Sequence, residues 1–226
     1  MAFPVAPGCR SGASASSDVE LTGRRRALHP YGGRLTLSAR GHAMSSSNLA
    51  GRRVAILATD GFEQSELVDP KRLLEQAGAE TDVIAPGRAG RIMSWNRTDW
   101  GDEIDVDVAL EDAQADDYDA LVLPGGVMNP DKLRTQPAAL SLVQAFAEAD
   151  KPIAAICHGP WTLINADLVR DRRLTSWPSL RKDLENAGAH WQDAAVVRDG
   201  RLITSRNPGD IPAFTGALIE LLGATA

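Results

Sequence analysis

The sequence predicts an α/β protein whose mostly parallel central sheet is covered by helices on both faces. From Gly51 onward, short apolar and β-rich runs alternate with segments of helical periodicity. Such alternation is typical of parallel strands joined by crossover helices. The 226 residues, 43% of them hydrophobic and 24% charged, suit one globular domain of roughly 150 residues or more with an extension.

Strands are predicted where short apolar runs end in turn residues. The first run ends at Asp60-Gly61, and the run over 120–123 leads into Pro124-Gly125-Gly126. The segments 91–95 and 104–108 are more polar and predict an exposed hairpin or meander. The predicted core strands cover 53–59, 81–85, 120–123, 152–156, and segments near 194–197 and 201–205.

Helices are predicted between these strands. In the first, over 66–77, apolar residues form one face, Gly78 stops the helix, and Pro70 lies in the first turns, where proline is tolerated. Ligands of such a fold bind at the carboxyl ends of the strands. The remaining helices are predicted over 137–149, from about 160, over 180–187 and over 211–222.

Residues 1–48 differ in composition from the rest. They are rich in Ser, Gly and Ala and contain six Arg against only Asp18 and Glu20. Without a sustained apolar period they cannot offset the entropy of ordering, so we expect a disordered basic extension before a single domain over 49–226. Such a leader also suits an organelle transit peptide. The favoured alternative is plain disorder or an upstream translation start, with Met44 as the initiator.

Composition excludes several classes of protein. A net charge of -6 argues against nucleic acid as a main partner. The two cysteines, Cys9 and Cys157, exclude a disulfide scaffold and favour a reducing, cytoplasmic location. Scattered histidines and the lack of a phosphate or dinucleotide motif predict no metal and no cofactor. The sequence has no apolar run of 18 residues, so no membrane contact is expected.

Cys157 is the leading candidate nucleophile. In Ala155-Ile156-Cys157-His158-Gly159 a buried strand breaks directly into a helix, as in a nucleophile elbow but without that motif's first glycine. Unpaired amides and the dipole at a helix N-terminus lower a thiol pKa, so we expect an activated thiol. The alternative is a buried Cys that packs as a small apolar group.

His158 and two backbone amides are the candidate partners of Cys157. A Cys-His pair at the start of a helix favours function, although adjacent side chains in a helix point apart and a lone histidine is often a turn residue. The backbone amides of His158 and Gly126 are candidate donors to a developing oxyanion. The glycine pair at 125–126 otherwise makes a tight turn.

Two acidic residues follow other strands. Glu63, just beyond the first strand, is expected to face Cys157; if protonated, it would donate to the thiolate and share one proton with it. The alternative for Glu63, as for Glu66, is an exposed acid in a first helical turn. Asp131, at a probable helix start, would either orient a histidine or compensate the helix dipole.

Taken together, these segments resemble the PfpI-type intracellular protease and deglycase family of the class I glutamine amidotransferase-like superfamily, which also holds the Parkinson disease protein seven. The likeness covers about residues 52–222. The motifs that carry it are Asp60-Gly61-Phe62-Glu63 with Glu66-Leu67, the run Asp119 to Gly126, Ala155-Ile156-Cys157-His158-Gly159-Pro160 and Leu174-Thr175-Ser176-Trp177-Pro178.

The resemblance implies a flavodoxin-like three-layer sandwich and a catalytic set of Cys157, His158 and Glu63. It further implies an acid supplied by a neighbouring subunit at the position of Asp131, hence a homodimer or hexamer. Archaeal proteases of this family carry glutamate there, and the shorter side chain of Asp131 puts a full protease triad in doubt. Trp161, just after the elbow, either narrows the pocket or packs in the helix.

Family members are described as proteases, as deglycases or glyoxalases, and as oxidative-stress proteins. Thiolate attack on a carbonyl is common to the proteases and to the deglycases or glyoxalases, and a glyoxal carbonyl is an easier target than a peptide bond. We therefore expect a cysteine hydrolase that acts on small carbonyl compounds or modified protein side chains in stress protection, or else a peptidase. The alternative is a non-enzymatic stress sensor or chaperone with an oxidisable Cys157.

Overall fold

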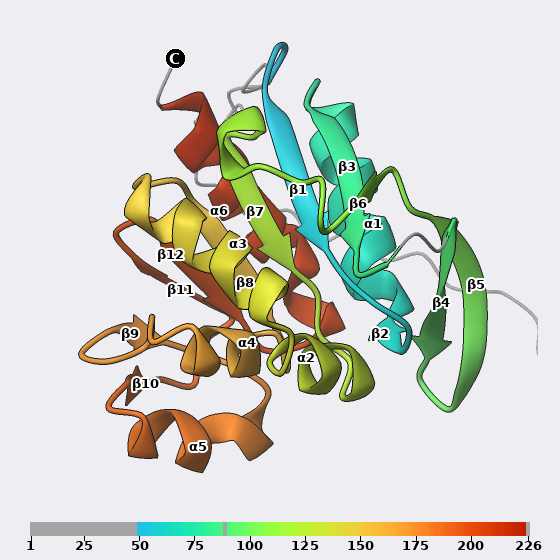
Figure 1. Ribbon diagram of the computed structural model, residues 1–226. Helices are drawn as coiled ribbons and strands as arrows, with labels where there is room; N and C mark the ends of the chain where they lie inside the picture. The colour runs from blue at the N-terminus through green and yellow to red at the C-terminus, as the bar shows by residue number, and fades with distance from the viewer. Residues whose placement is uncertain (1–48, 88–89, 225–226) are drawn as a thin grey trace, which may run out of the picture. The chain divides into compact units, whose positions relative to one another are not determined.

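The computed structural model describes residues 49–87 and 90–224. The predicted extension over 1–48, with Cys9 and Met44, lies outside these residues. The described chain forms the predicted α/β fold, with a seven-stranded sheet in the order β11-β12-β8-β7-β1-β3-β6 (Figure 1). Its strands are β1 (Arg53–Leu57), β3 (Glu80–Ala85), β6 (Val108–Ala109), β7 (Ala120–Leu123), β8 (Ile153–Ile156), β11 (Val196–Asp199) and β12 (Leu202–Ser205).

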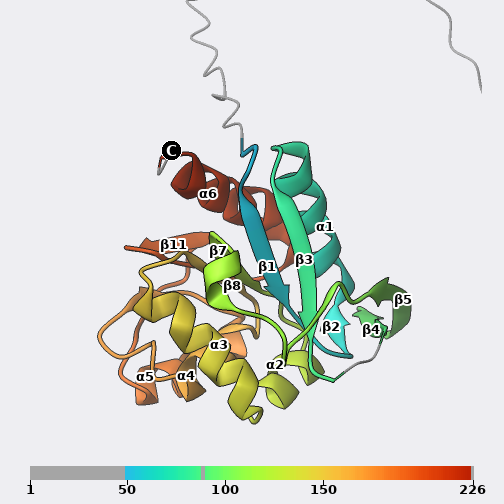
Figure 2. The ribbon, with the colours of Figure 1, turned by 45° about the horizontal axis from the view of Figure 1, so that its top comes forward.

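Every pair in this sheet is parallel except β11 with β12. The central strands β7 and β8 are buried along their whole length, since helices cover both faces. Figure 2 shows α1 and α6 on one side of the sheet and α3 on the other. The helices are α1 (Gln64–Gln76), α2 (Met128–Leu133), α3 (Pro137–Glu148), α4 (Pro160–Asn165), α5 (Arg181–Asn186) and α6 (Ile211–Gly223).

The core consists of two apolar layers, one on each face of the sheet. On one face Val54 and Ile56 of β1 pack with Leu67 of α1 and Phe214 of α6. On the other face Leu121 of β7 belongs to a cluster with residues of α3 and α4. Alternate residues of each strand thus enter opposite layers, which fixes the register of the parallel sheet.

Two small sheets flank the main one. β2 (Phe62–Glu63), β4 (Arg91–Asn96) and β5 (Asp99–Asp105) form the first, and β9 (Arg173–Leu174) pairs with β10 (His190–Trp191) in the second. The predicted hairpin is present as β4 and β5, but β5 begins earlier than expected. Val108 belongs to β6 of the main sheet, because the chain returns there to pair with β3.

Other boundaries also differ from prediction. The first strand ends at Leu57, and α1 begins at Gln64, two residues before the predicted start. A helix start is expected near Asp131, and α2 contains this residue, but the strands β9 and β10 are not predicted, because each spans only two residues and shows no period. Three 3₁₀ turns cover Ala115–Asp117, Pro178–Leu180 and Pro208–Asp210. Among the described residues, no helix combines the length and apolar composition required to span a bilayer.

Candidate active site

The candidate active site lies where three neighbouring strands, β8, β7 and β1, end at their carboxyl edge. A cavity of about 800 Å³, called here the Cys157 cavity, opens at this edge. The sequence analysis places the ligand site at such an edge because parallel strands present their carboxyl ends together. Its lining residues are Glu63, Ser65, Glu66, Asp69, Trp95, Asn96, Arg97, Gly126, Val127, Cys157, His158, Trp177, Pro208 and Gly209.

Cys157 forms the sharp turn between β8 and α4. Its φ of 60° lies in the left-handed region that non-glycine residues rarely adopt. The surrounding backbone holds it there, because its N–H donates to Ser205 O at 3.0 Å and its carbonyl accepts from Trp177 N at 2.9 Å. Strain of this kind is typical of functional turns, and it points the thiol into the cavity with only 6% of the residue exposed.

Two backbone amides, which the sequence suggests as donors to an oxyanion, approach the sulfur. The N–H groups of Gly126 and His158 both donate toward Cys157 Sγ and act to lower its pKa. Gly126 has a φ of 75°, and a Cβ at this position would lie 2.6 Å from Glu63 N and from Gly61 O. Only glycine therefore lets this loop come close enough to direct its amide at the thiol.

The carboxyl group beside the thiol belongs to Glu66. This residue, in the first turn of α1, is fully buried, and its Oε2 accepts a hydrogen bond from Gly125 N at 2.9 Å. The thiol of Cys157 also interacts with this carboxyl group, although Oε1 has no hydrogen-bond partner in the part of the chain that the structure describes. Burial raises the pKa of Glu66 to about 8, even though the thiol and amide bonds lower it. Glu66 is therefore largely protonated at neutral pH.

The acid expected beside Cys157 is Glu63, but the carboxyl group there is that of Glu66, and the alternative of an exposed Glu66 does not hold. Glu63 is the N-cap residue of α1, with extended backbone, and its half-buried carboxyl group interacts with the backbone amide of Arg97 at the cavity wall. Glu66 lies one turn further along, and helical side chains lean toward the N-terminus of their helix, which here faces the strand ends. Burial raises the pKa of Glu63 as well, in spite of Arg97.

The thiol pKa also differs from expectation. From the sequence, the helix start is expected to lower the thiol pKa. Burial instead raises the pKa of Cys157, and an ionised Glu66 raises that pKa further. The amides of Gly126 and His158 oppose both effects without cancelling them. When Glu66 is protonated its electrostatic contribution disappears, and its O–H becomes a third donor to a thiolate. The pair therefore titrates as one unit.

His158 contacts the nucleophile. Its Nδ1 lies 3.3 Å from Cys157 Sγ, and its Nε2 lies 3.5 Å from Ser179 Oγ. The strand-to-helix break allows this contact between consecutive side chains. The ring is enclosed by Trp161 and Trp177, and burial lowers its pKa, so the neutral imidazole is favoured. Sequence reasoning did not single out Ser179, which lies in a short turn without a motif of its own.

Asp131 lies apart from this group. It is exposed on α2, and no contact joins its carboxyl group to His158 within the described residues. The single chain thus brings together Cys157, His158 and Glu66, while an acid at Asp131 would have to come from another subunit.

Tryptophans shape the cavity, but Trp161 does not narrow it. Trp161 donates from Nε1 to Asp183 at 2.9 Å and packs edge-on against His158, which supports the packing role. Trp177 and Trp95 line the cavity instead. Trp177 is 41% exposed and stacks on the His158 ring. Within the described ranges, no group of three or more His, Cys, Asp or Glu is placed to hold a metal ion.

Comparison with known proteins assigns the class. The DJ-1/PfpI family model matches residues 52–221, and the chain belongs to this family. It is 40% identical over 171 residues to the putative cysteine protease YraA of Bacillus subtilis, covering 76% of this chain and 98% of the relative. It is 41% identical over 170 residues to a deglycase of Pyrococcus abyssi, covering 75% and 99%.

The fold agrees with solved structures of this superfamily. DJ-1 of Schizosaccharomyces pombe is 28% identical, with a TM-score of 0.67 over 75% of this chain and 90% of that one. The predicted flavodoxin-like class is therefore confirmed, as is the resemblance to the PfpI-type family.

Proposed function

We propose that this chain is a cysteine-dependent hydrolase that acts on small reactive carbonyl compounds and on their adducts with protein side chains. The carrying observation is the contact of Cys157 with two backbone amides and a buried, protonated Glu66. Nucleophilic addition to a carbonyl requires a nucleophile, hydrogen-bond donors to the oxygen and a source of a proton, and these groups supply all of them. Relatives named as deglycase and as putative cysteine protease support a hydrolase of this kind.

The first step is addition of sulfur to an aldehyde carbon. The C–S bond forms, the C=O π pair moves to oxygen, and the proton of Glu66 neutralises that oxygen, leaving a hemithioacetal and the Glu66 carboxylate. The amides of Gly126 and His158 donate to the oxygen as its charge develops. His158 Nδ1, 3.3 Å from the sulfur, takes the thiol proton before attack.

The second stage returns the enzyme. In a methylglyoxal adduct, Glu66 removes the proton on the sulfur-bearing carbon and the protonated His158 gives a proton to the neighbouring carbonyl oxygen, which forms an enediol. Glu66 then returns its proton to the neighbouring carbon, and the hydroxyl group on the sulfur-bearing carbon gives its proton to His158, which leaves a lactoyl thioester. Water then cleaves the thioester, releasing lactate and the free thiol. The overall reaction adds one water to methylglyoxal and needs no external oxidant or reductant.

The volume of the Cys157 cavity favours a small carbonyl compound over a folded polypeptide as substrate. The sulfur lies in a cavity of about 800 Å³, within the usual range for small-molecule sites, and Trp95 and Trp177 form part of its wall. A glyoxal unit on an arginine or lysine side chain suits such a space.

A contribution of Asp131 from a second subunit, in a homodimer or larger oligomer, is part of the same proposal.

The test supplies three substrates to the full-length protein: methylglyoxal, methylglyoxal-treated N-acetylarginine and a fluorogenic peptide. We expect lactate from the first two, little peptide cleavage, and no turnover by Cys157→Ser. Peptide cleavage without lactate formation would assign a peptidase. Oxidation of Cys157 by mild peroxide without turnover of any substrate would assign a stress sensor and contradict the proposal.

A further inference from the structure

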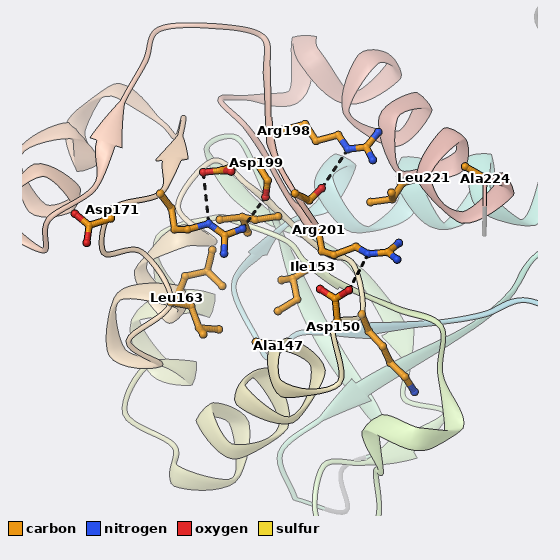
Figure 3. A pocket seen from close by; sticks show the side chains of 15 residues that line it. Ala147, Asp150, Ile153, Leu163, Asp171, Arg198, Asp199, Arg201, Leu221 and Ala224 are labelled. Carbon is orange, nitrogen blue, oxygen red and sulfur yellow. Dashed lines mark hydrogen bonds and ion pairs between the residues drawn. The ribbon is translucent and has the colours of Figure 1, made fainter.

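A second cavity lies at the amino-terminal ends of β8 and β12 (Figure 3). It measures about 740 Å³ and is called here the amino-end cavity. Ile153 and Leu202, the first residues of β8 and β12, form part of its wall, together with residues from the ends of α3 and α6. The mechanism uses none of its residues. Its full lining is Ala147, Asp150, Lys151, Ile153, Leu163, Leu168, Asp171, Arg172, Arg198, Asp199, Gly200, Arg201, Leu202, Leu221 and Ala224.

The inner wall of the amino-end cavity is apolar. Ile153, Leu163, Leu202 and Leu221 are all buried and come from four different elements. Such a wall provides a surface for the hydrocarbon part of a ligand.

Charged residues form the rest of the wall, and two of the cations are committed to the protein itself. Lys151 Nζ donates to the carbonyls of Ala115 and Tyr118, at 2.8 Å each. Arg172 donates to Asp199 O at 2.6 Å and forms an ion pair with the Asp199 carboxylate at 3.5 Å. These two side chains are structural and leave little charge for a ligand.

Arg198 and Arg201 are different. Arg198 Nε donates to Gly200 O at 3.2 Å, and Arg201 Nε pairs with Asp150 at 3.4 Å. In the part of the chain that the structure describes, the hydrogen bonds of both guanidinium groups use Nε alone. Figure 3 shows the two side chains extending in the same direction from one β-hairpin, beside Leu221. Their terminal N–H groups are thus available as planar donors to an anion.

The acidic residues limit the charge of that anion. Asp150, Asp171 and Asp199 also line the amino-end cavity, so four basic side chains face three acidic ones. A multiply charged anion would be repelled by the carboxylates, whereas a single negative charge can be held by the terminal N–H groups of Arg198 and Arg201.

We propose that the amino-end cavity binds a monocarboxylate with an apolar chain or ring. The carboxylate accepts hydrogen bonds from the terminal N–H groups of Arg198 and Arg201, and the apolar part packs against Leu168, Leu202 and Leu221. The occupant also contacts Ile153, at the start of the strand that ends beside Cys157.

The test is calorimetric titration of the full-length protein with octanoate below its micelle concentration. We expect saturable binding of one octanoate per chain, weakened at least about tenfold in Arg198→Gln/Arg201→Gln, since charge-assisted hydrogen bonds are lost. The matched control Arg91→Gln/Arg181→Gln removes two exposed arginines elsewhere and should leave affinity unchanged. Cys157→Ser should also bind normally, which separates this site from the Cys157 cavity.

Octanol and inorganic phosphate complete the design. Octanol should bind at least about tenfold more weakly than octanoate, and inorganic phosphate should not compete with octanoate. Equal binding of octanol, unchanged affinity in Arg198→Gln/Arg201→Gln, or effective competition by phosphate would each overturn the proposal. Retention of the thermal transition in both double variants confirms that any loss of binding is not a loss of fold.

Discussion

The two ends of the central sheet hold their acidic groups in opposite ways. At the amino end, Asp119 pairs with Arg52 at 2.8 Å and Asp82 with Arg53 at 2.6 Å. Asp199 pairs there with Arg172. A hydrogen bond from the backbone N–H of Arg173 and the positive charges of Arg172 and Arg173 lower the pKa of Asp199. At the carboxyl end, Glu66 is buried with no ion pair among the described residues, and burial raises its pKa.

The difference shows what each kind of acid can do. A carboxylate held by arginine stays ionised across the physiological range and serves to fix the chain. A buried carboxyl group without a cation keeps its proton until about pH 8, so it can deliver that proton to a reacting oxygen.

The pH dependence of stability separates the two ends most strongly. Because folding raises the pKa of Glu66 from 4.5 to about 8, its contribution is complete below pH 4.5 and is lost as the pH rises toward 8. Between about pH 4.5 and 9, the wild type should lose on the order of 4 kcal/mol more unfolding free energy than Glu66→Gln. Urea unfolding of both proteins measures this difference.

The comparison of wild type with Glu66→Gln cancels the titrating groups that do not interact with Glu66. His158, whose pKa is lowered by burial, destabilises the fold below its ordinary pKa in both proteins alike. Parallel pH profiles for the wild type and the variant would show that Glu66 is ionised in the folded state.

Catalysis should depend on Glu66 rather than on Glu63. Glu66→Gln keeps the shape of the side chain and an acceptor for Gly125 N but removes the proton donor, so lactate formation should fall about 100-fold or more. Glu63→Gln, the matched control three residues earlier, should lower the rate by less than about tenfold. The reverse order of effects would restore the prediction made from the sequence.

Thiol reactivity should respond to the charge of Glu66. Above about pH 8 an ionised Glu66 raises the pKa of Cys157, so removal of this charge favours the thiolate. The rate of Cys157 alkylation in Glu66→Gln, divided by the wild-type rate, should therefore rise about tenfold as the pH passes through 8.

Peptide mass spectrometry is needed for the alkylation measurement, because it distinguishes Cys157 from Cys9. In Glu63→Gln the same ratio should stay close to one at every pH. A flat ratio in Glu66→Gln would mean that the two side chains do not interact.

The smallest effect is expected at the paired end. Asp199→Asn removes one partner of a partly exposed ion pair, and such pairs contribute roughly 0–1 kcal/mol. The unfolding free energy should change by no more than about 1 kcal/mol at neutral pH, and lactate formation should not change. A loss of activity here would mean that the two ends of the sheet are coupled.

The sequence predicts the parallel sheet well because its central strands are apolar along their whole length. It also places Cys157 at a strand end, since the strand and the following Gly159-Pro160 mark both sides of the turn. Short strands such as β9 and β10 could not be predicted, because their formation depends on contacts with distant segments rather than on a local period.

The choice between Glu63 and Glu66 shows where a motif misleads. Both fit the acid expected after the first strand, but Glu66 shares the buried side of α1 with Leu67, Pro70 and Leu74. That helical spacing was available in the sequence and would have indicated a buried carboxyl group. The pKa of the pair could not be predicted, since it depends on the depth of burial and on the direction of individual amides.

The most direct measurement is a carbon-13 NMR titration of the glutamate side-chain carboxyl groups, with the Glu66 signal assigned by its absence in Glu66→Gln. We expect this signal to titrate near pH 8, well above the ordinary glutamate value of 4.5. In Cys157→Ala the midpoint should not fall, because the thiol hydrogen bond lowers the Glu66 pKa. A wild-type midpoint between about 4 and 5 would contradict the claim that Glu66 brings a proton to the reaction.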